Sequence, residues 1–306
     1  MTEWTPQGAE ELAGEALAAV GIVDGRPSLV KFRGAFATLR IERPPLLVKI
    51  AATESDSAIL ERSLRIGEFL RQGGVAVTAP AVELARGPVR VGEHTAGLWH
   101  WERSRQGQPD PEATGRSLRA MHEALTACTV GVPVLDAVGT SHRRLAVVRE
   151  RGVVPAASVD FLSARLDRLS EAWDRFETML RVGPIHGDFK LSNLLATPGG
   201  PLIMDLDNVR VGPWEWDLAT ISRSAHDGWS AEDWPAFSAG YGHDLFSQPE
   251  AEPLRELTHL GALTFQLVRH QSPERLRRGR TLLDQWLREP EKGCHELDWE
   301  GAFSLG

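Results

Sequence analysis

The sequence predicts an α+β fold with a β-rich N-terminal lobe, residues 1–102, and a mainly helical C-terminal lobe, residues 103–306. The first lobe is predicted by short apolar runs, separated by turn residues, around one long helical stretch. The second is predicted by the change after Arg103, where apolar residues recur at helical spacing. A chain of 306 residues is long enough to bury a core in each lobe.

The N-terminal lobe is expected to form a small antiparallel meander with two helices. The first helix is expected from Thr5-Pro6 to Val20, because proline suits the first turn. The second is expected at 58–72, capped within residues 55–57 and ended by Gly73-Gly74. Strands are expected at 28–33, 35–42, 46–50, 81–86 and 97–102.

The C-terminal lobe is expected to be built from long helices. Asp110-Pro111 opens one with apolar residues at Leu118, Met121 and Leu125. Residues 128–157, with scattered proline and glycine, allow no assignment. Further helices are expected at 159–180, 215–226, 231–240, 253–270 and 273–288.

A hairpin interrupts this helical part. Two short apolar runs flank the turn Thr197-Pro198-Gly199-Gly200. Folding them together brings Asp205 to within about one residue of Asn193 across the strands. We expect Asp188 to converge with both, and oxygen ligands that include an amide suit magnesium better than zinc. The alternative is three surface polar residues beside a hairpin.

The composition indicates an ordinary soluble protein. The net charge of the chain is −8. The part from Glu215 onward has 16 acidic and 9 basic residues, a net charge of −7, so most of the acidic excess lies there. This balance argues against nucleic acid and permits a cationic small-molecule partner, although a solvated acidic surface is the alternative. No run is long enough to span a membrane, and the N-terminus lacks signal-peptide features. Two cysteines predict neither a disulfide framework nor a zinc site, so we expect a cytoplasmic protein.

Lys49 is a candidate for holding phosphate. It lies in the apolar run Leu46–Ile50, and a buried lysine needs a carboxylate partner, which Glu61 on the next helix could supply. A lysine that extends its amine into solvent is the alternative. With a carboxylate beside two metal ligands, such a cation completes the equipment for phosphoryl transfer.

The order of these motifs resembles the aminoglycoside phosphotransferase family, which includes choline, homoserine and other small-molecule kinases. The resemblance spans residues 48–219 and implies the bilobal protein-kinase-like fold. The motifs are Val48-Lys49-Ile50, Glu61, His186-Gly187-Asp188, Asn193, Ile203-Met204-Asp205 and Trp216-Asp217-Leu218-Ala219.

The resemblance implies a role for each matching residue. Asp188 would orient the acceptor hydroxyl and could deprotonate it. Asn193 and Asp205 would bind magnesium. Lys49 would hold the nucleotide α- and β-phosphates, and Glu61 would hold Lys49.

Other matching positions are implied to support the site. His186 and Asp217 would support the catalytic loop, and Asp207 would assist the metal or lie behind it. Backbone groups of the hinge segment Trp99-His100-Trp101 would meet the purine. The phosphate-covering turn, residues 31–38, departs from a glycine-rich loop because Gly34 is its one glycine.

These features predict an ATP- or GTP-dependent O-phosphotransferase whose acceptor is an aminoglycoside or amino sugar. Alternatives are a choline-, homoserine- or sugar-kinase-like enzyme and an inactive nucleotide-binding module. A different-class alternative is a hydrolase whose metals are held by His186, Asp188, Asp205 and Asp207. Candidates to line an acceptor pocket are Trp229, Trp234, Trp286, Glu215, Asp227, Glu232, Asp233 and Asp284. For the three tryptophans, packing between helices is the favoured alternative.

Overall fold

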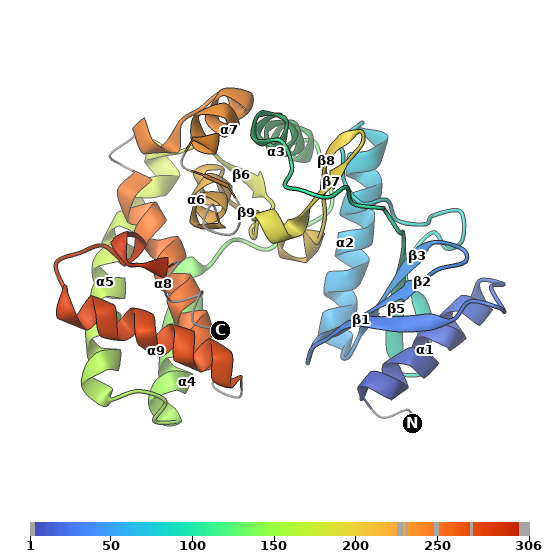
Figure 1. Ribbon diagram of the computed structural model, residues 1–306, viewed down its shortest axis with the longest axis horizontal. Helices are drawn as coiled ribbons and strands as arrows, with labels where there is room; N and C mark the ends of the chain where they lie inside the picture. The colour runs from blue at the N-terminus through green and yellow to red at the C-terminus, as the bar shows by residue number, and fades with distance from the viewer. Residues whose placement is uncertain (1–3, 225–228, 231, 248–250, 270–271, 300–306) are drawn as a thin grey trace. The chain divides into compact units, whose positions relative to one another are not determined.

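The computed structural model describes residues 4–224, 229–230, 232–247, 251–269 and 272–299. The chain forms two compact units, each assembled from two stretches of sequence (Figure 1). The first unit comprises Met1–Val132 and Ser192–Val209, and the second comprises Pro133–Leu191 and Arg210–Gly306. The expected division into lobes at residues 102 and 103 differs from this grouping and stays a prediction. No helix within the described ranges is both long and apolar enough to cross a membrane.

The sheet of the first unit has the strand order β1-β2-β3-β5-β4, with antiparallel neighbours. Alternate residues of its central strands, such as Leu39, Val48 and Ile50, are fully buried in one apolar cluster with the helix α1 (Pro6–Ala19). The meander at 28–50 is therefore confirmed to within a residue or two at each end. The strands are β1 (Pro27–Phe32), β2 (Phe36–Ile41), β3 (Leu46–Ala51), β4 (Val89–Val91) and β5 (His94–His100).

The strand expected at 81–86 is wrong. The amides of Leu84 and Ala85 both donate to the carbonyl of Ala81, at 3.0 and 3.1 Å, so the backbone turns there. The edge of the sheet is formed instead by β4, which pairs with β5. Two local hydrogen bonds to one carbonyl outweigh the strand preference of this short apolar run.

Helix α2 (Glu54–Gln72) starts four residues earlier than expected. Thr53, rather than residues 55–57, is its N-cap, and its Oγ1 accepts a hydrogen bond from the amide of Asp56 at 3.2 Å. Helix α3 (Pro111–Leu125) is confirmed, and its N-cap Asp110 accepts from the amide of Ala113 at 2.7 Å.

The predicted hairpin is confirmed as β7 (Leu194–Thr197) and β8 (Gly200–Ile203). Leu194 lies opposite Ile203, and the amide of Met204 donates to the carbonyl of Asn193 at 3.0 Å. Asp205 therefore follows the residue opposite Asn193, as the turn length predicts. Ile203 also forms a parallel bridge with Val77, which ties the hairpin into the first unit.

The second unit is mainly helical around the short antiparallel pair β6 (Val182–Ile185) and β9 (Arg210–Pro213). Its helices are α4 (Ala137–Glu150), α5 (Ala156–Met179), α6 (Glu215–Ser224), α7 (Asp233–Tyr241), α8 (Glu252–Val268) and α9 (Pro273–Arg288). The buried faces of α4, α5, α8 and α9 share one core, with Leu162, Leu263 and Trp286 among its residues. Helix α4 lies in the stretch that the sequence left unassigned.

Four short 3₁₀ turns lie in the described ranges: η1 (Leu191–Asn193), η2 (Leu206–Asn208), η4 (Leu245–Ser247) and η6 (Cys294–Glu296). Three residues at predicted helix ends, His226, Ala231 and His270, lie outside the described residues.

Candidate active site

Lys49 lies at the centre of a charged cluster in the first unit. Its Nζ is 3.3 Å from Asp205 Oδ1, forms a second ion pair with Asp207, and lies 4.6 Å from the ring centroid of Phe36. Burial alone lowers the pKa of Lys49, but the two carboxylates outweigh it and hold the pKa above its usual value. The lysine is therefore held charged, as a phosphate-binding cation must be.

The turn after β8 presents both carboxylates to Lys49. Asp205 has φ 63° and ψ 64°, the left-handed conformation that aspartate tolerates better than most residues. Asp207 follows within η2, and its Oδ1 accepts a hydrogen bond from Ser63 Oγ at 3.1 Å. Ser63 is buried on α2, so this helix contacts the cluster through a hydroxyl group.

The expected pairing of Lys49 with Glu61 is wrong. Glu61 is exposed, and within the described part of the chain it makes no ion pair with Lys49. The reason is helical geometry: about 100° of rotation per residue puts Leu60, Ser63 and Leu64 on the buried face and leaves Glu61 off it. Sequence reasoning missed Ser63, which the apolar spacing of α2 could have placed on that face.

The predicted metal ligands are one amide and one carboxylate at the base of the hairpin. Asn193 is buried at the end of η1, and Asp205 follows the residue opposite it. The described ranges contain no group of three His, Cys, Asp or Glu side chains able to hold a metal. A smaller oxygen set fits magnesium, which commonly keeps its waters and shares substrate phosphates.

The loop that carries Asp188, predicted to be catalytic, is held in the second unit by Asp217. Its buried carboxylate accepts hydrogen bonds from the amides of His186, at 2.7 Å, and Gly187, at 2.9 Å. Gly187 has φ 81°, a conformation that glycine adopts without penalty. His186 is fully buried, and its Nδ1 accepts from the amide of Asp188 at 3.3 Å. These contacts fix the backbone that carries Asp188.

Lys190 is a second residue that sequence reasoning missed. Its Nζ donates to Asp188 Oδ2 at 2.6 Å within the same loop. The available signal was its rarity, because the chain has four lysines and one of them stands two residues after Asp188. The convergence of Asp188 with Asn193 and Asp205 stays a prediction, since these residues belong to different units.

The hinge expected at Trp99-His100-Trp101 has its backbone donors engaged. The amide of His100 donates to Ala79, and that of Trp101 to Pro45, each at 2.9 Å. The ring of Trp99 packs with buried apolar residues. Both amides are therefore already hydrogen-bonded within the first unit, and the purine contact stays a prediction. Gly34 has no positive φ, and a Cβ there would meet nothing within 4 Å, so its phosphate-covering role stays a prediction.

The aromatic residues suggested for an acceptor pocket are mostly packing residues. Trp286 is fully buried in the core, and Trp229 is buried beside Phe237. Trp234 is half-buried and donates to Asp244 Oδ1 at 2.9 Å. Of the acidic candidates, Glu215 is buried, Glu232 and Asp284 are exposed, Asp233 is half-buried, and Asp227 lies outside the described residues.

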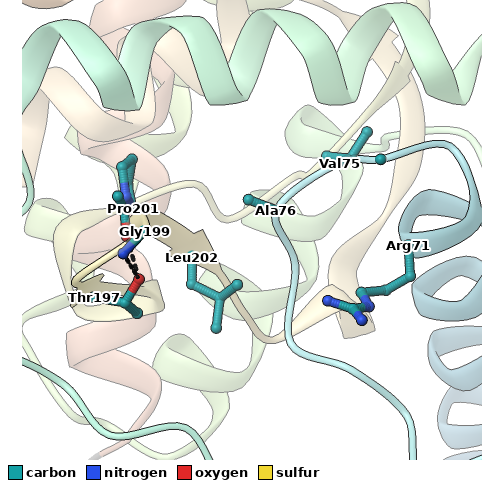
Figure 2. A pocket seen from close by; sticks show the side chains of 9 residues that line it. Arg71, Val75, Ala76, Thr197, Gly199, Pro201 and Leu202 are labelled. Atoms are coloured by element: carbon teal, nitrogen blue, oxygen red, sulfur yellow. Dashed lines mark hydrogen bonds between the residues drawn. The ribbon is translucent and has the colours of Figure 1, made fainter.

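A separate pocket of about 360 Å³ lies in the first unit, at the turn of the hairpin (Figure 2). Its wall is formed by the β7–β8 turn, the segment after α2 and the side chain of Arg71. None of the predicted site residues lines it.

The sheet with one inserted helix, the hairpin and the helical second unit together define the protein-kinase-like fold. A model of the phosphotransferase enzyme family matches residues 34–257, and the chain belongs to this family. It is therefore a small-molecule phosphotransferase, which confirms the predicted resemblance and enzyme class and counts against the hydrolase. A search of curated proteins found no match.

Solved structures of small-molecule kinases share the fold at low sequence identity. A microcompartment-associated aminopropanol kinase is 19% identical with a TM-score of 0.70, covering 91% of this chain and 98% of that one. An amicoumacin kinase in complex with AMP-PNP and Ca²⁺ is 16% identical with a TM-score of 0.65, covering 90% and 91%. Aminoglycoside 2'-phosphotransferase-IIIa in its GDP complex is 10% identical with a TM-score of 0.66, covering 92% and 98%.

Proposed function

We propose that this protein transfers the γ-phosphoryl group of ATP or GTP to a hydroxyl group of a small molecule. The observation that carries the proposal is the position of Lys49, a charged lysine on a sheet strand, 3.3 Å from Asp205 at the base of the hairpin. Lys49 would bind the α- and β-phosphates, with its side chain held in place by the ion pair with Asp207. Solved nucleotide complexes of kinases with this fold support the choice of co-substrate.

Magnesium fits the oxygen atoms of Asn193 and Asp205, and when bound it would neutralise phosphate charge. The chain's own contribution is positioning. Asp188 would accept a hydrogen bond from the acceptor hydroxyl and orient its oxygen toward the phosphoryl group. Asp217 would keep Asp188 in place through the amides of the catalytic loop.

In this proposal the purine is bound by backbone groups that follow the expected hinge residues 99–101 in the chain. Because the amides of His100 and Trp101 are engaged, the next backbone groups, those of Glu102 and Arg103, would serve as donors. Neither of these amides donates to a backbone carbonyl in the described part of the chain.

The acceptor class has separate support. Solved kinases with this fold are described as acting on an aminoglycoside, amicoumacin or aminopropanol. Together with the net charge of −7 from Glu215 onward, this favours an acceptor with an amine, such as an amino sugar. A choline-, homoserine- or sugar-kinase-like activity is the alternative.

Asp188→Asn tests the transfer chemistry. The variant keeps the size of the side chain but loses its charge, so we expect transfer to fall by about 10²–10⁴-fold while nucleotide affinity changes little. ADP release would be measured over a panel of hydroxylated amines, sugars and acids, with nucleotide affinity measured separately. Glu61→Gln, an exposed site, is the control. Near-normal turnover by Asp188→Asn on an identified acceptor would contradict the assignment.

A further inference from the structure

The segment after α2 is turned toward the hairpin by a helix cap. Gly74 has φ 77°, the left-handed conformation that glycine adopts without steric penalty. Its amide donates to the carbonyl of Arg71 at 3.0 Å, and the amide of Val75 donates to that of Leu70 at 2.9 Å. This pair of bonds is the Schellman arrangement that commonly ends a helix. It engages these last carbonyls of α2 and leads the chain to Ala76, beside β8.

A short parallel ladder joins this segment to β8, and the ladder stops at Pro201. The amide of Ile203 donates to the carbonyl of Ala76, and the amide of Thr78 donates to that of Ile203, each at 2.9 Å. The next bonds of a parallel ladder would run from the amide of Ala76 to the carbonyl of Pro201 and from the nitrogen of Pro201 to the carbonyl of Gly74. Proline has no N–H, so the second bond cannot form, and the first is not made either. The amide of Ala76 therefore has no hydrogen-bond partner among the residues that the structure describes.

The pocket at the turn of the hairpin opens where these two segments separate (Figure 2). Its volume of about 360 Å³ falls within the range of small-molecule sites, about 300–1,000 Å³. A Cβ built on either of two lining glycines, Gly74 and Gly200, would meet nothing within 4 Å, so the backbone leaves space there. The turn that forms one wall is held by Thr197, whose Oγ1 donates to the carbonyl of Gly200 at 2.7 Å and accepts from the amide of Gly199 at 3.2 Å. This wall is therefore shaped before any ligand binds.

Arg71 supplies the one charged side chain in the wall of the pocket. It is exposed and leaves α2 on the side of the Val75–Ala76 segment (Figure 2). In the part of the chain that the structure describes, its guanidinium forms no ion pair, and no carboxylate lines the pocket. Glu68, one turn earlier on α2, accepts a hydrogen bond from Gln72 at 3.1 Å instead. The pocket thus offers a cation and an unpartnered amide beside the apolar side chain of Leu202.

We propose that this pocket binds a small molecule that carries one carboxylate on an apolar body. One carboxylate oxygen accepts from the Arg71 guanidinium and the other from the amide of Ala76, while the apolar body covers Leu202 and Pro201. A single cation matches one carboxylate charge better than the charge of a phosphate monoester, about −1.5 to −2 at pH 7. The site goes beyond the proposed phosphotransfer, because none of the residues predicted to act on nucleotide or acceptor lines it.

NMR titration of the full chain tests the site and locates it. Benzoate is the probe, benzamide keeps its shape without the charge, and phenyl phosphate replaces the carboxylate with a phosphate. Excess ADP with magnesium is added to occupy Lys49. We expect benzoate to shift the amide signals of residues 74–76 and 199–202 and to bind at least fivefold more tightly than benzamide. Equal or tighter binding of either other probe, or shifts confined to other segments, would overturn the proposal.

Two variants remove the charge and the space separately. Arg71→Gln removes the cation, and Gly199→Leu fills the pocket at a residue without a positive φ, where a Cβ would meet only Thr197 Oγ1, at 3.8 Å. We expect each to weaken benzoate binding by at least fivefold. Arg65→Gln is the matched control, because Arg65 is exposed on the same helix and does not line the pocket.

Benzoate binding that either variant retains in full, or that Arg65→Gln loses equally, would contradict the site. Amide spectra that match the wild type outside the pocket show that a variant is folded, and Arg71→Gln decides alone if Gly199→Leu does not fold. The titration measures no turnover, so a failure of the proposed phosphotransfer would leave its result unchanged.

Discussion

At the scale of residues, the charged cluster shows how a lysine stays ionised inside an apolar strand. Lys49 has Asp205 and Asp207 as partners, and Ser63 donates a hydrogen bond to Asp207. The resemblance of the motif order implied that Lys49 and Asp205 belong to one site; their side chains lie 3.3 Å apart, and their roles in that site stay predictions. Sequence reasoning predicted the wrong carboxylate for Lys49, because the period of a helix separates Glu61 from the buried face by one position.

Lys49 and Asp207 should behave as one unit in a double-mutant cycle. Lys49→Met removes the phosphate-binding cation, and Asp207→Asn removes the carboxylate that positions it. We expect each change to weaken nucleotide binding and the double variant to lose little more than Lys49→Met alone, a coupling of about 0.5–3 kcal/mol. Nucleotide affinity would be measured by titration for the wild type, the two single variants and the double variant. Glu61→Gln should leave affinity near wild type, and additive losses for Lys49 and Asp207 would rule out the pairing.

At the scale of elements, boundaries marked by a helix cap or a turn were predicted better than helices and strands whose apolar residues lack a clear period. Asp110 before proline and the Pro-Gly-Gly turn each predicted a boundary that the structure confirms. Helix α4 escaped detection because Gly139 stands in its first turn and valines lower its helix propensity. Residues 81–86 were predicted to form a strand because the two hydrogen bonds that turn the backbone at Ala81 cannot be recognised from the local sequence.

Helix α8 contains a histidine that should make stability depend on pH. His259 is buried, and its Nδ1 contacts the carbonyl of Arg255 at 2.8 Å. Burial, together with the charge of Arg223, holds the pKa of His259 well below 6.5. The unfolded chain therefore takes up a proton below about pH 6.5 that the folded chain resists, and stability falls as the pH falls.

Thermal unfolding at pH 7.5 and 5.5 measures this effect. We expect His259→Gln to lose less stability between the two pH values than the wild type does. The control is His142→Gln, because His142 is only half-buried and lies beside the exposed Asp167 in the same unit. An equal pH dependence of wild type and His259→Gln would show that other groups cause it.

At the scale of the whole molecule, summed charge was a poor guide to local charge. The count of −7 from Glu215 onward is correct, yet Arg269 and Arg275 from that stretch gather with Arg144 around Phe265. Composition reports totals, whereas the fold decides which charges become neighbours. Motif order is different, because it follows the chain itself, and it was enough to predict the family.

Nucleotide and magnesium should stabilise the molecule together. Ligand at a hundred times its Kd adds about 2.7 kcal/mol to the free energy of unfolding of the unit that binds it. We therefore expect ADP with magnesium to raise Tm by several degrees and EDTA to remove most of the gain. Scanning calorimetry of wild type and Asp205→Asn checks this. A metal-dependent gain that Asp205→Asn retains in full would exclude Asp205 as a ligand.

The division of each unit between two stretches of chain also affects how the protein is made. The first unit needs Ser192–Val209 as well as Met1–Val132, and the second unit begins between them. During synthesis, the N-terminal sheet leaves the ribosome long before the hairpin that completes its unit. The first unit can therefore be completed only after about sixty residues of the second have been translated. No single continuous fragment of the chain reproduces either unit.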